Sequence, residues 1–194
     1  MRKLLLILIL TLSFQTINKA DDISDFQIEG MSVGDSLLSY FTESEIKKRI
    51  NSDNTFFYQK DFMAISLSYK TGKFKTYDDV GVILKQNDKQ YKIYSLEGTF
   101  TNTDGDIEDC YKQQNLIADD IEKIIDPKYV RDIWFEQKKR LEPHQLSVKY
   151  LNFISPDGKK PFSLVCYDIK RKTKLTHLYV VVDSEEFDEY LNTY

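Results

Sequence analysis

Residues 106–125 have the sequence DIEDCYKQQNLIADDIEKII, and this stretch decides the expected fold. Its apolar side chains recur at intervals of three and four residues, which is the spacing of one face of an α-helix. This stripe comprises Ile107, Cys110, Tyr111, Ile117, Ala118, Ile121, Ile124 and Ile125. Pro127 follows and ends the pattern. We therefore predict a long amphipathic helix from about Asp106 to Ile125.

Strand-like segments lie on both sides of this helix. In three segments before the helix and in three after it, apolar residues alternate with polar ones. Short turns separate most of these segments, which is typical of antiparallel hairpins. These segments are Phe62–Tyr69, Tyr77–Gln86, Tyr91–Phe100, Gln145–Phe153, Phe162–Lys170 and Leu175–Asp183. Residues 136–140, which follow Trp134 and Phe135, are mostly charged and are interpreted as a connector.

Shorter helices are expected at the two ends. Leu37, Leu38 and Phe41 have helical spacing within residues 34–41, and Thr42 and Glu45 form a capping box that begins a helix running to about Ile50. A last short helix is expected at residues 184–191.

The predicted fold class is α+β, because hairpins dominate and no βαβ periodicity is present. Two three-stranded antiparallel meanders would flank the long amphipathic helix, with two short N-terminal helices and a short C-terminal helix. Residues 21–194 would form a single domain, or two lobes at 21–103 and 104–194. The pattern leaves open whether the two meanders share one six-stranded sheet.

The first twenty residues have the pattern of a secretory signal peptide. Arg2 and Lys3 precede the apolar run LLLILILTL, residues 4–12, and a polar segment leads to a small residue at Ala20. The apolar run is shorter than the about 20 residues of a membrane span. We expect cleavage after Ala20 and, since no cysteine lies near this junction, no lipid anchor. The expected location is the periplasm, with no membrane anchor in the mature chain.

The charge balance narrows the range of partners. The whole chain has 27 basic and 31 acidic residues, a net charge of −4. Residues 1–20 contain three of the basic residues and no acid, so the chain after Ala20 has 24 basic and 31 acidic residues, a net charge of −7. Nucleic acids and anionic membrane surfaces are therefore not expected as partners, because both require a basic patch.

The two cysteines are expected to form a disulfide. Cys110 lies on the apolar stripe of the long helix, and Cys166 alternates with Phe162 and Leu164 on a strand face that should be buried. A helix packed on that face would bring the sulfurs together, and an oxidising compartment would favour their bond. The alternative is two separately buried thiols. A redox role is not expected, since the chain has no CxxC pair.

No metal or cofactor site is expected. The acidic segment 101–109, TNTDGDIED, does not fit a calcium loop with Gly105 at its sixth position, because Phe100 and Tyr111 then occupy the first and twelfth positions. Acids at a helix N-terminus are the better interpretation. His144 and His177 are the only histidines, and a zinc site needs three or four ligands. The chain also lacks nucleotide-binding glycine motifs.

One segment resembles a known family. The block GMSVGDSLL, residues 30–38, is similar to the Gly-Met-Ser start of the BamE/SmpA-type outer-membrane assembly lipoproteins. That resemblance implies two helices followed by a three-stranded meander, over less than half of the chain. Over its whole length the chain is similar to uncharacterised exported proteins of Pelagibacter-like marine alphaproteobacteria, which implies a periplasmic address and no particular activity.

Together these observations predict a non-catalytic exported protein that binds a periplasmic or outer-membrane protein or associates with the cell envelope. The alternative is a periplasmic hydrolase with a site near His177 and Asp168, although no serine lies in a GxSxG elbow. A small-ligand carrier would require an apolar cavity between helix and sheet. The abundant tyrosines, among them Tyr167 and Tyr179, belong either to the core or to a binding face.

Overall fold

The computed structural model describes residues 25–58, 61–67, 74–102, 106–139, 145–170 and 174–193. Its strands are β1 (Gln27–Ile28), β2 (Met31–Ser32), β3 (Phe56–Tyr58), β4 (Phe62–Ser66), β5 (Asp79–Lys85), β6 (Ile93–Asn102), β7 (Val130–Lys139), β8 (Gln145–Ile154), β9 (Phe162–Lys170) and β10 (Lys174–Asp183). Its helices are α1 (Glu43–Ile50), α2 (Ile107–Ile121) and α3 (Glu185–Thr193), with a 3₁₀ turn at Leu37–Ser39.

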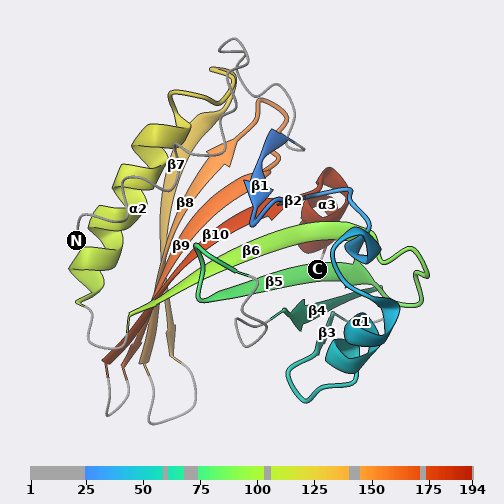
Figure 1. The fold of residues 1–194 in the computed structure, drawn as a ribbon. Coiled ribbons are helices and arrows are strands. Elements are labelled where there is room, and N and C mark those ends of the chain that lie inside the picture. Colours follow the sequence, from blue (N-terminus) through green and yellow to red (C-terminus); the bar gives the residue numbers. More distant parts are fainter. Residues whose placement is uncertain are drawn as a thin grey trace.

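The strands β3 to β10 form one antiparallel sheet in the order β3-β4-β5-β6-β10-β9-β8-β7 (Figure 1). The predicted α+β fold, with two three-stranded meanders around a long helix, is therefore wrong: the chain is mostly β. Two strands absent from the prediction, β3 and β7, extend the sheet at its edges. The pairing of β6 with β10 joins the strands before α2 to those after it.

Residues 136–139 of the segment interpreted as a charged connector are instead the end of β7. Its ten residues pair with β8 from Val130↔Ile154 to Lys139↔Gln145. The charges are compatible with a strand because β7 is an edge strand, whose side chains can reach water on both faces.

The first predicted N-terminal helix, at residues 34–41, is reduced to the 3₁₀ turn. Gly34 has φ +95°, outside the helical region, and its N–H donates to Ile93 O at 2.8 Å. The Leu37 N–H donates to Tyr91 O at 3.0 Å. These amides bond to the segment that leads into β6, so they do not continue a helix. Within residues 30–38, Met31 and Ser32 form β2 and pair with β1.

The other helices agree with the prediction. Thr42 caps α1 with a capping box, in which its hydroxyl accepts the Glu45 N–H and Glu45 accepts the Thr42 N–H at 2.8 Å. The helix α2 begins after the N-cap Asp106, whose side chain accepts the Glu108 N–H. The last helix, α3, closes the described chain near the predicted place.

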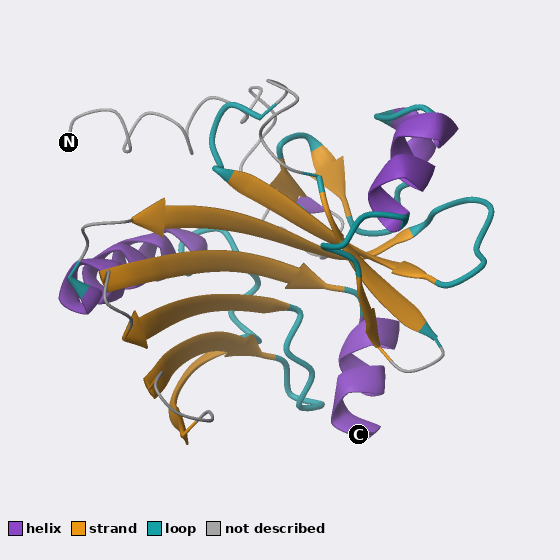
Figure 2. Cartoon of the chain, turned by 90° about the horizontal axis from the view of Figure 1, so that it is seen from below, coloured by secondary structure: helices purple, strands orange, loops and turns teal. Residues whose placement is uncertain are grey.

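The two faces of the sheet differ in what covers them. One face packs under α2, the β1–β2 hairpin and α1, and we call it the helix face. Its buried side chains include Val82, Leu96, Leu151, Leu164 and Val180. We call the other face the open face. Of the elements that the structure describes, α3 alone covers it, at one end, through a cluster of Phe62, Ile83, Tyr94 and Phe187. Figure 2 shows α1 and α3 on opposite sides of the sheet.

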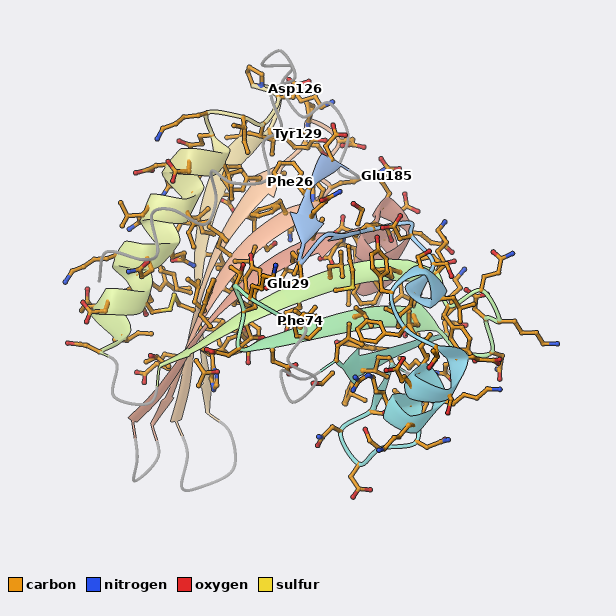
Figure 3. All side chains as sticks on the ribbon, viewed as in Figure 1. Phe26, Glu29, Phe74, Asp126, Tyr129 and Glu185 are labelled. Atoms are coloured by element: carbon orange, nitrogen blue, oxygen red, sulfur yellow. A yellow bond between two sulfur atoms is a disulfide. The ribbon has the colours of Figure 1, made fainter. Side chains whose placement is uncertain are left out.

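An N-terminal strap closes over the helix face. The Glu29 carboxylate accepts the backbone N–H groups of Lys75, Thr76 and Tyr77, at 3.1, 2.6 and 3.2 Å. Glu29 itself has φ +54° and precedes Gly30 at φ +81°, which makes the tight turn between β1 and β2. Figure 3 shows Glu29 and Phe74 close together over the middle of the sheet. One carboxylate thus fastens the β1–β2 hairpin to the segment before β5.

The predicted disulfide is confirmed. Cys110 of α2 and Cys166 of β9 are bonded, with their Cα atoms 6.1 Å apart and a sequence separation of 56. One helical turn further along α2, the fully buried Gln114 donates from Nε2 to Lys149 O at 3.0 Å and to Leu164 O at 2.8 Å. The disulfide and this amide fix α2 across β8 and β9.

Several predictions fall outside the described residues: the signal sequence Met1–Ala20 with its cleavage site, Asp104 of the acidic segment, and His144. Among the residues that are described, no helix is long and apolar enough to cross a membrane.

We predict that reducing the disulfide lowers the free energy of unfolding by about 4 kcal/mol, because a loop of this length loses that much entropy when it is closed in the unfolded chain. Urea denaturation with and without reductant measures the difference. The C110A/C166A variant should be equally destabilised and should not respond to reductant. A reductant effect below about 1 kcal/mol on the wild type would contradict the prediction.

Gly98 provides a second test of the packing on the helix face. A Cβ added there would lie 2.4 Å from Cε1 of Tyr77, whose ring packs on Phe100 with centroids 4.7 Å apart. We expect G98A to lower the free energy of unfolding by about 1–3 kcal/mol through overpacking. The matched control is G81A on the neighbouring strand, where the added Cβ meets Glu97 Cβ at an ordinary 3.5 Å. Equal unfolding midpoints for the two variants would refute this account.

Candidate functional site

The strand β7 is a long, exposed sheet edge. Among the described strands it pairs with β8 alone, so one side of its ten-residue backbone has no described neighbour in the sheet. Four of its apolar side chains are about half exposed or more: Val130 (65%), Ile133 (48%), Trp134 (53%) and Phe135 (60%). Proteins usually protect such edges, since a free row of backbone donors and acceptors can pair with another chain. The opposite edge follows that rule, because β3 has only three residues.

Side chains of β8 and α2 hold the exposed aromatic side chains of β7 in place. Trp134 stacks on Tyr150 of β8 with ring centroids 5.1 Å apart. On the helix face, Phe135 meets Tyr111 of α2 edge-on at 6.2 Å, and Lys149 Nζ lies 5.7 Å from the Phe135 ring and 4.6 Å from the Tyr111 ring. These contacts orient both rings before any partner arrives, which lowers the entropy lost on binding.

The start of β7 is tied to α2. Arg131 Nη1 lies 2.8 Å from Asp119 Oδ1, and its Nη2 donates to Asn115 Oδ1 at 2.8 Å. Beside it is a shallow depression with a mainly apolar floor, lined by Lys128, Val130, Arg131, Asp132, Ile154, Ser155 and Pro156. The exposed edge therefore continues into a small concave surface at its beginning.

Aromatic side chains cross the open face from β7 towards its centre. Tyr150 and Tyr167 share a hydrogen bond, and Tyr167 meets Tyr179 edge-on with centroids 4.9 Å apart. Tyr167 and Tyr179 are thus partly exposed on the open face, whereas Tyr91 and Tyr94 are buried at 8% and 7% exposure. Tyr91 and Tyr94 therefore belong to the buried part of the protein, whereas Tyr167 and Tyr179 stay accessible on the open face.

Two carboxyl groups lie next to this row on the open face. Burial, with the neighbouring charges of Asp183 and Asp79, raises the pKa of Glu97 to about 7. Burial, opposed by a hydrogen bond from Ser95 and supported by the charge of Asp188, raises the pKa of Asp183 to about 7. Neither residue stands out in the sequence, since a charged residue at an outward position of a strand is ordinary.

The residues proposed for a hydrolase do not come together. His177 pairs with Tyr167 and Asp168 pairs with Thr176, so on these adjacent strands their side chains lie on opposite faces of the sheet. His177 Nδ1 is 3.2 Å from Thr101 Oγ1, and partial burial lowers its pKa. The charge of Asp168 instead reaches Tyr111 under α2.

The acidic segment before α2 caps the helix, as its interpretation predicted. Asp106 is the N-cap, and Glu108 and Asp109 lie in the first turn. Within the described ranges, no group of three His, Cys, Asp or Glu side chains is arranged to hold a metal ion. Among the described residues, one depression lies at the start of β7 and another beside α3; neither lies between α2 and the sheet.

Comparison of the chain with family models, with curated proteins and with solved structures finds no match.

We predict that Asp183 makes the protein less stable as pH rises. The ordinary aspartate pKa is 3.8, so between about pH 4 and 7 the folded chain keeps a proton that the unfolded chain has released. The free energy of unfolding should fall across this window by about 4 kcal/mol from this group and then level off. D183N should remove that part of the fall, as measured by urea denaturation at several pH values.

The control is D53N, in an exposed turn after α1. It should keep the wild-type pH dependence. If D183N and the wild type lose stability in parallel between about pH 4 and 8, Asp183 is not the responsible group.

Proposed function

We propose that this protein is an exported, non-catalytic binding protein that pairs with an extended segment of a partner protein along the edge of β7. The observation that carries the proposal is the combination of a ten-residue edge strand with three consecutive exposed apolar side chains, Ile133, Trp134 and Phe135. Strand addition supplies affinity through backbone hydrogen bonds and specificity through alternate side chains.

The charges around Trp134 suggest the chemistry of the partner. Asp132 and Glu136 lie on the open face two positions to either side of Trp134. In an antiparallel or parallel pair, directly opposed side chains share a face and opposite charges stabilise the pair. The partner strand should therefore place an apolar residue opposite Trp134 and basic residues opposite the two acids. Apolar residues should face Ile133 and Phe135 on the other side.

Other observations agree with this proposal. The disulfide is a bond that persists in oxidising compartments, which supports export and, as we propose, a periplasmic location. The separation of His177 and Asp168 onto opposite faces removes the geometry suggested for hydrolysis. Of the two functions considered, protein binding is therefore the better supported.

A synthetic peptide tests the proposal directly. Trp134 is the single tryptophan of the chain, so its fluorescence reports on β7 alone. Titration with the peptide TKVIVKT should change this fluorescence, whereas the charge-reversed peptide TEVIVET should not. F135K should weaken binding by at least about 10-fold, because it places a charge in the pairing edge and removes a central aromatic contact.

The matched control is F56K on β3, where Phe56 has the same 60% exposure as Phe135 on the other sheet edge. It should leave the titration unchanged. Three results would overturn the proposal: no fluorescence change up to about 1 mM peptide, equal binding of both peptides, or equal losses in F135K and F56K. Self-association of the purified chain that F135K abolishes would instead assign the edge to a second copy.

A further inference from the structure

The depression at the start of β7 lies on the open face of the sheet. Arg131 reaches α2 with both of its Nη atoms, so its side chain is on the helix face and that of Val130, the preceding residue, is on the open face. Val130 pairs with Ile154 of β8, and both residues line the depression, whose volume is about 400 Å³. Asp126 and Tyr129 mark this end of the sheet in Figure 3.

The turn between β8 and β9 forms a fixed wall of the depression. The Ser155 N–H donates to Lys159 O at 2.9 Å, and the Gly158 N–H donates to Ser155 O at 2.9 Å. The Lys159 N–H also donates to the Ser155 hydroxyl at 3.1 Å. Pro156, which lines the depression, has its φ angle fixed by its ring. The wall is therefore ordered before a ligand arrives, which lowers the entropy lost when a side chain enters.

The depression is in register with the partner strand that we propose for β7, and this step rests on that proposal. Val130 lies two positions before Asp132 and four before Trp134, so the three side chains share the open face. The partner residue opposite Val130 then shares this face with the residues opposite Asp132 and Trp134. A large side chain reaches beyond its direct partner, so it can cross Val130 and contact Ile154.

The direction of the partner strand decides which of its residues meets Val130. Every pair of neighbouring strands in the described sheet is antiparallel, and parallel pairs are slightly less stable per residue. In an antiparallel partner, the residue opposite Val130 comes four positions after the residue opposite Trp134.

We propose that the depression receives a large apolar side chain of the partner strand, and that this strand runs antiparallel to β7. The partner segment then has the order basic, three apolar residues, basic, any residue, large apolar. Burial of the last side chain against Val130 and Ile154 adds affinity in proportion to the apolar area that is covered. A charged side chain at this position binds less well, because an apolar floor does not replace its hydration.

Two peptides of identical composition, TKVIVKTF and FTKVIVKT, test the pocket and the direction together. Both are acetylated and amidated, so that no terminal charge differs between them. In an antiparallel pair TKVIVKTF places its phenylalanine opposite Val130, whereas FTKVIVKT does so only in a parallel pair. Titration followed by Trp134 fluorescence should give TKVIVKTF an affinity at least about 5-fold higher than that of FTKVIVKT or of the core peptide TKVIVKT.

The variant V130D should remove this preference, because it places a charge in the floor of the depression. The affinities of the two peptides are compared within one variant, so the general effect of the new charge on basic peptides cancels. V130D should fold, since Val130 is 65% exposed at the first position of an edge strand. The matched control is L116D on α2, where Leu116 is 56% exposed, and it should keep the preference.

Equal affinities of the two phenylalanine peptides, or a preference that V130D keeps, would overturn the pocket. A preference for FTKVIVKT would overturn the antiparallel direction. If TKVIVKT binds and phenylalanine adds nothing at either end, the β7 proposal stands and this inference fails. If TKVIVKT does not bind up to about 1 mM, the β7 proposal fails and this inference fails with it.

Discussion

The pairing of β6 with β10 is the constraint on which the rest of the structure depends. Eight consecutive residue pairs, from Thr176↔Asn102 to Asp183↔Ser95, join two sets of hairpins into one sheet. A shared sheet gives α2, α1 and the β1–β2 hairpin one continuous core on the helix face. The same pairing places Glu97 beside Asp183 on the open face.

The periodicity of the sequence was sufficient to predict the helix and strands that bury one face. The apolar stripe of α2 and the alternation around Cys166 each identify a buried face, and two buried faces that must meet account for the Cys110–Cys166 bond. The capping box at Thr42 was equally readable, because it depends only on residues three positions apart. These signals depend on residues close together in sequence, so they can be read without knowledge of the rest of the fold.

The remaining features depend on neighbours distant in sequence. Alternation identifies the face of a strand but not its partner, so the β6–β10 pairing and the single sheet were not predictable. The sequence of β7 does not even alternate between apolar and polar residues, since Ile133, Trp134 and Phe135 are apolar in succession. As an edge strand, β7 leaves these side chains exposed on both faces of the sheet. Glu97 and Asp183 become unusual only when the two strands lie side by side.

The position of the disulfide also affects how readily the sheet forms during folding. Asn102 and Thr176 are 74 residues apart along the chain, yet they are paired in the sheet. Through the Cys110–Cys166 bond the path between them is eight residues, the bond, and ten more. Loop entropy grows with the logarithm of length, so this shortcut lowers the closure cost by about 1 kcal/mol. In an oxidised chain the most distant strand pairing therefore becomes a nearly local event, and the topology folds with a lower effective contact order.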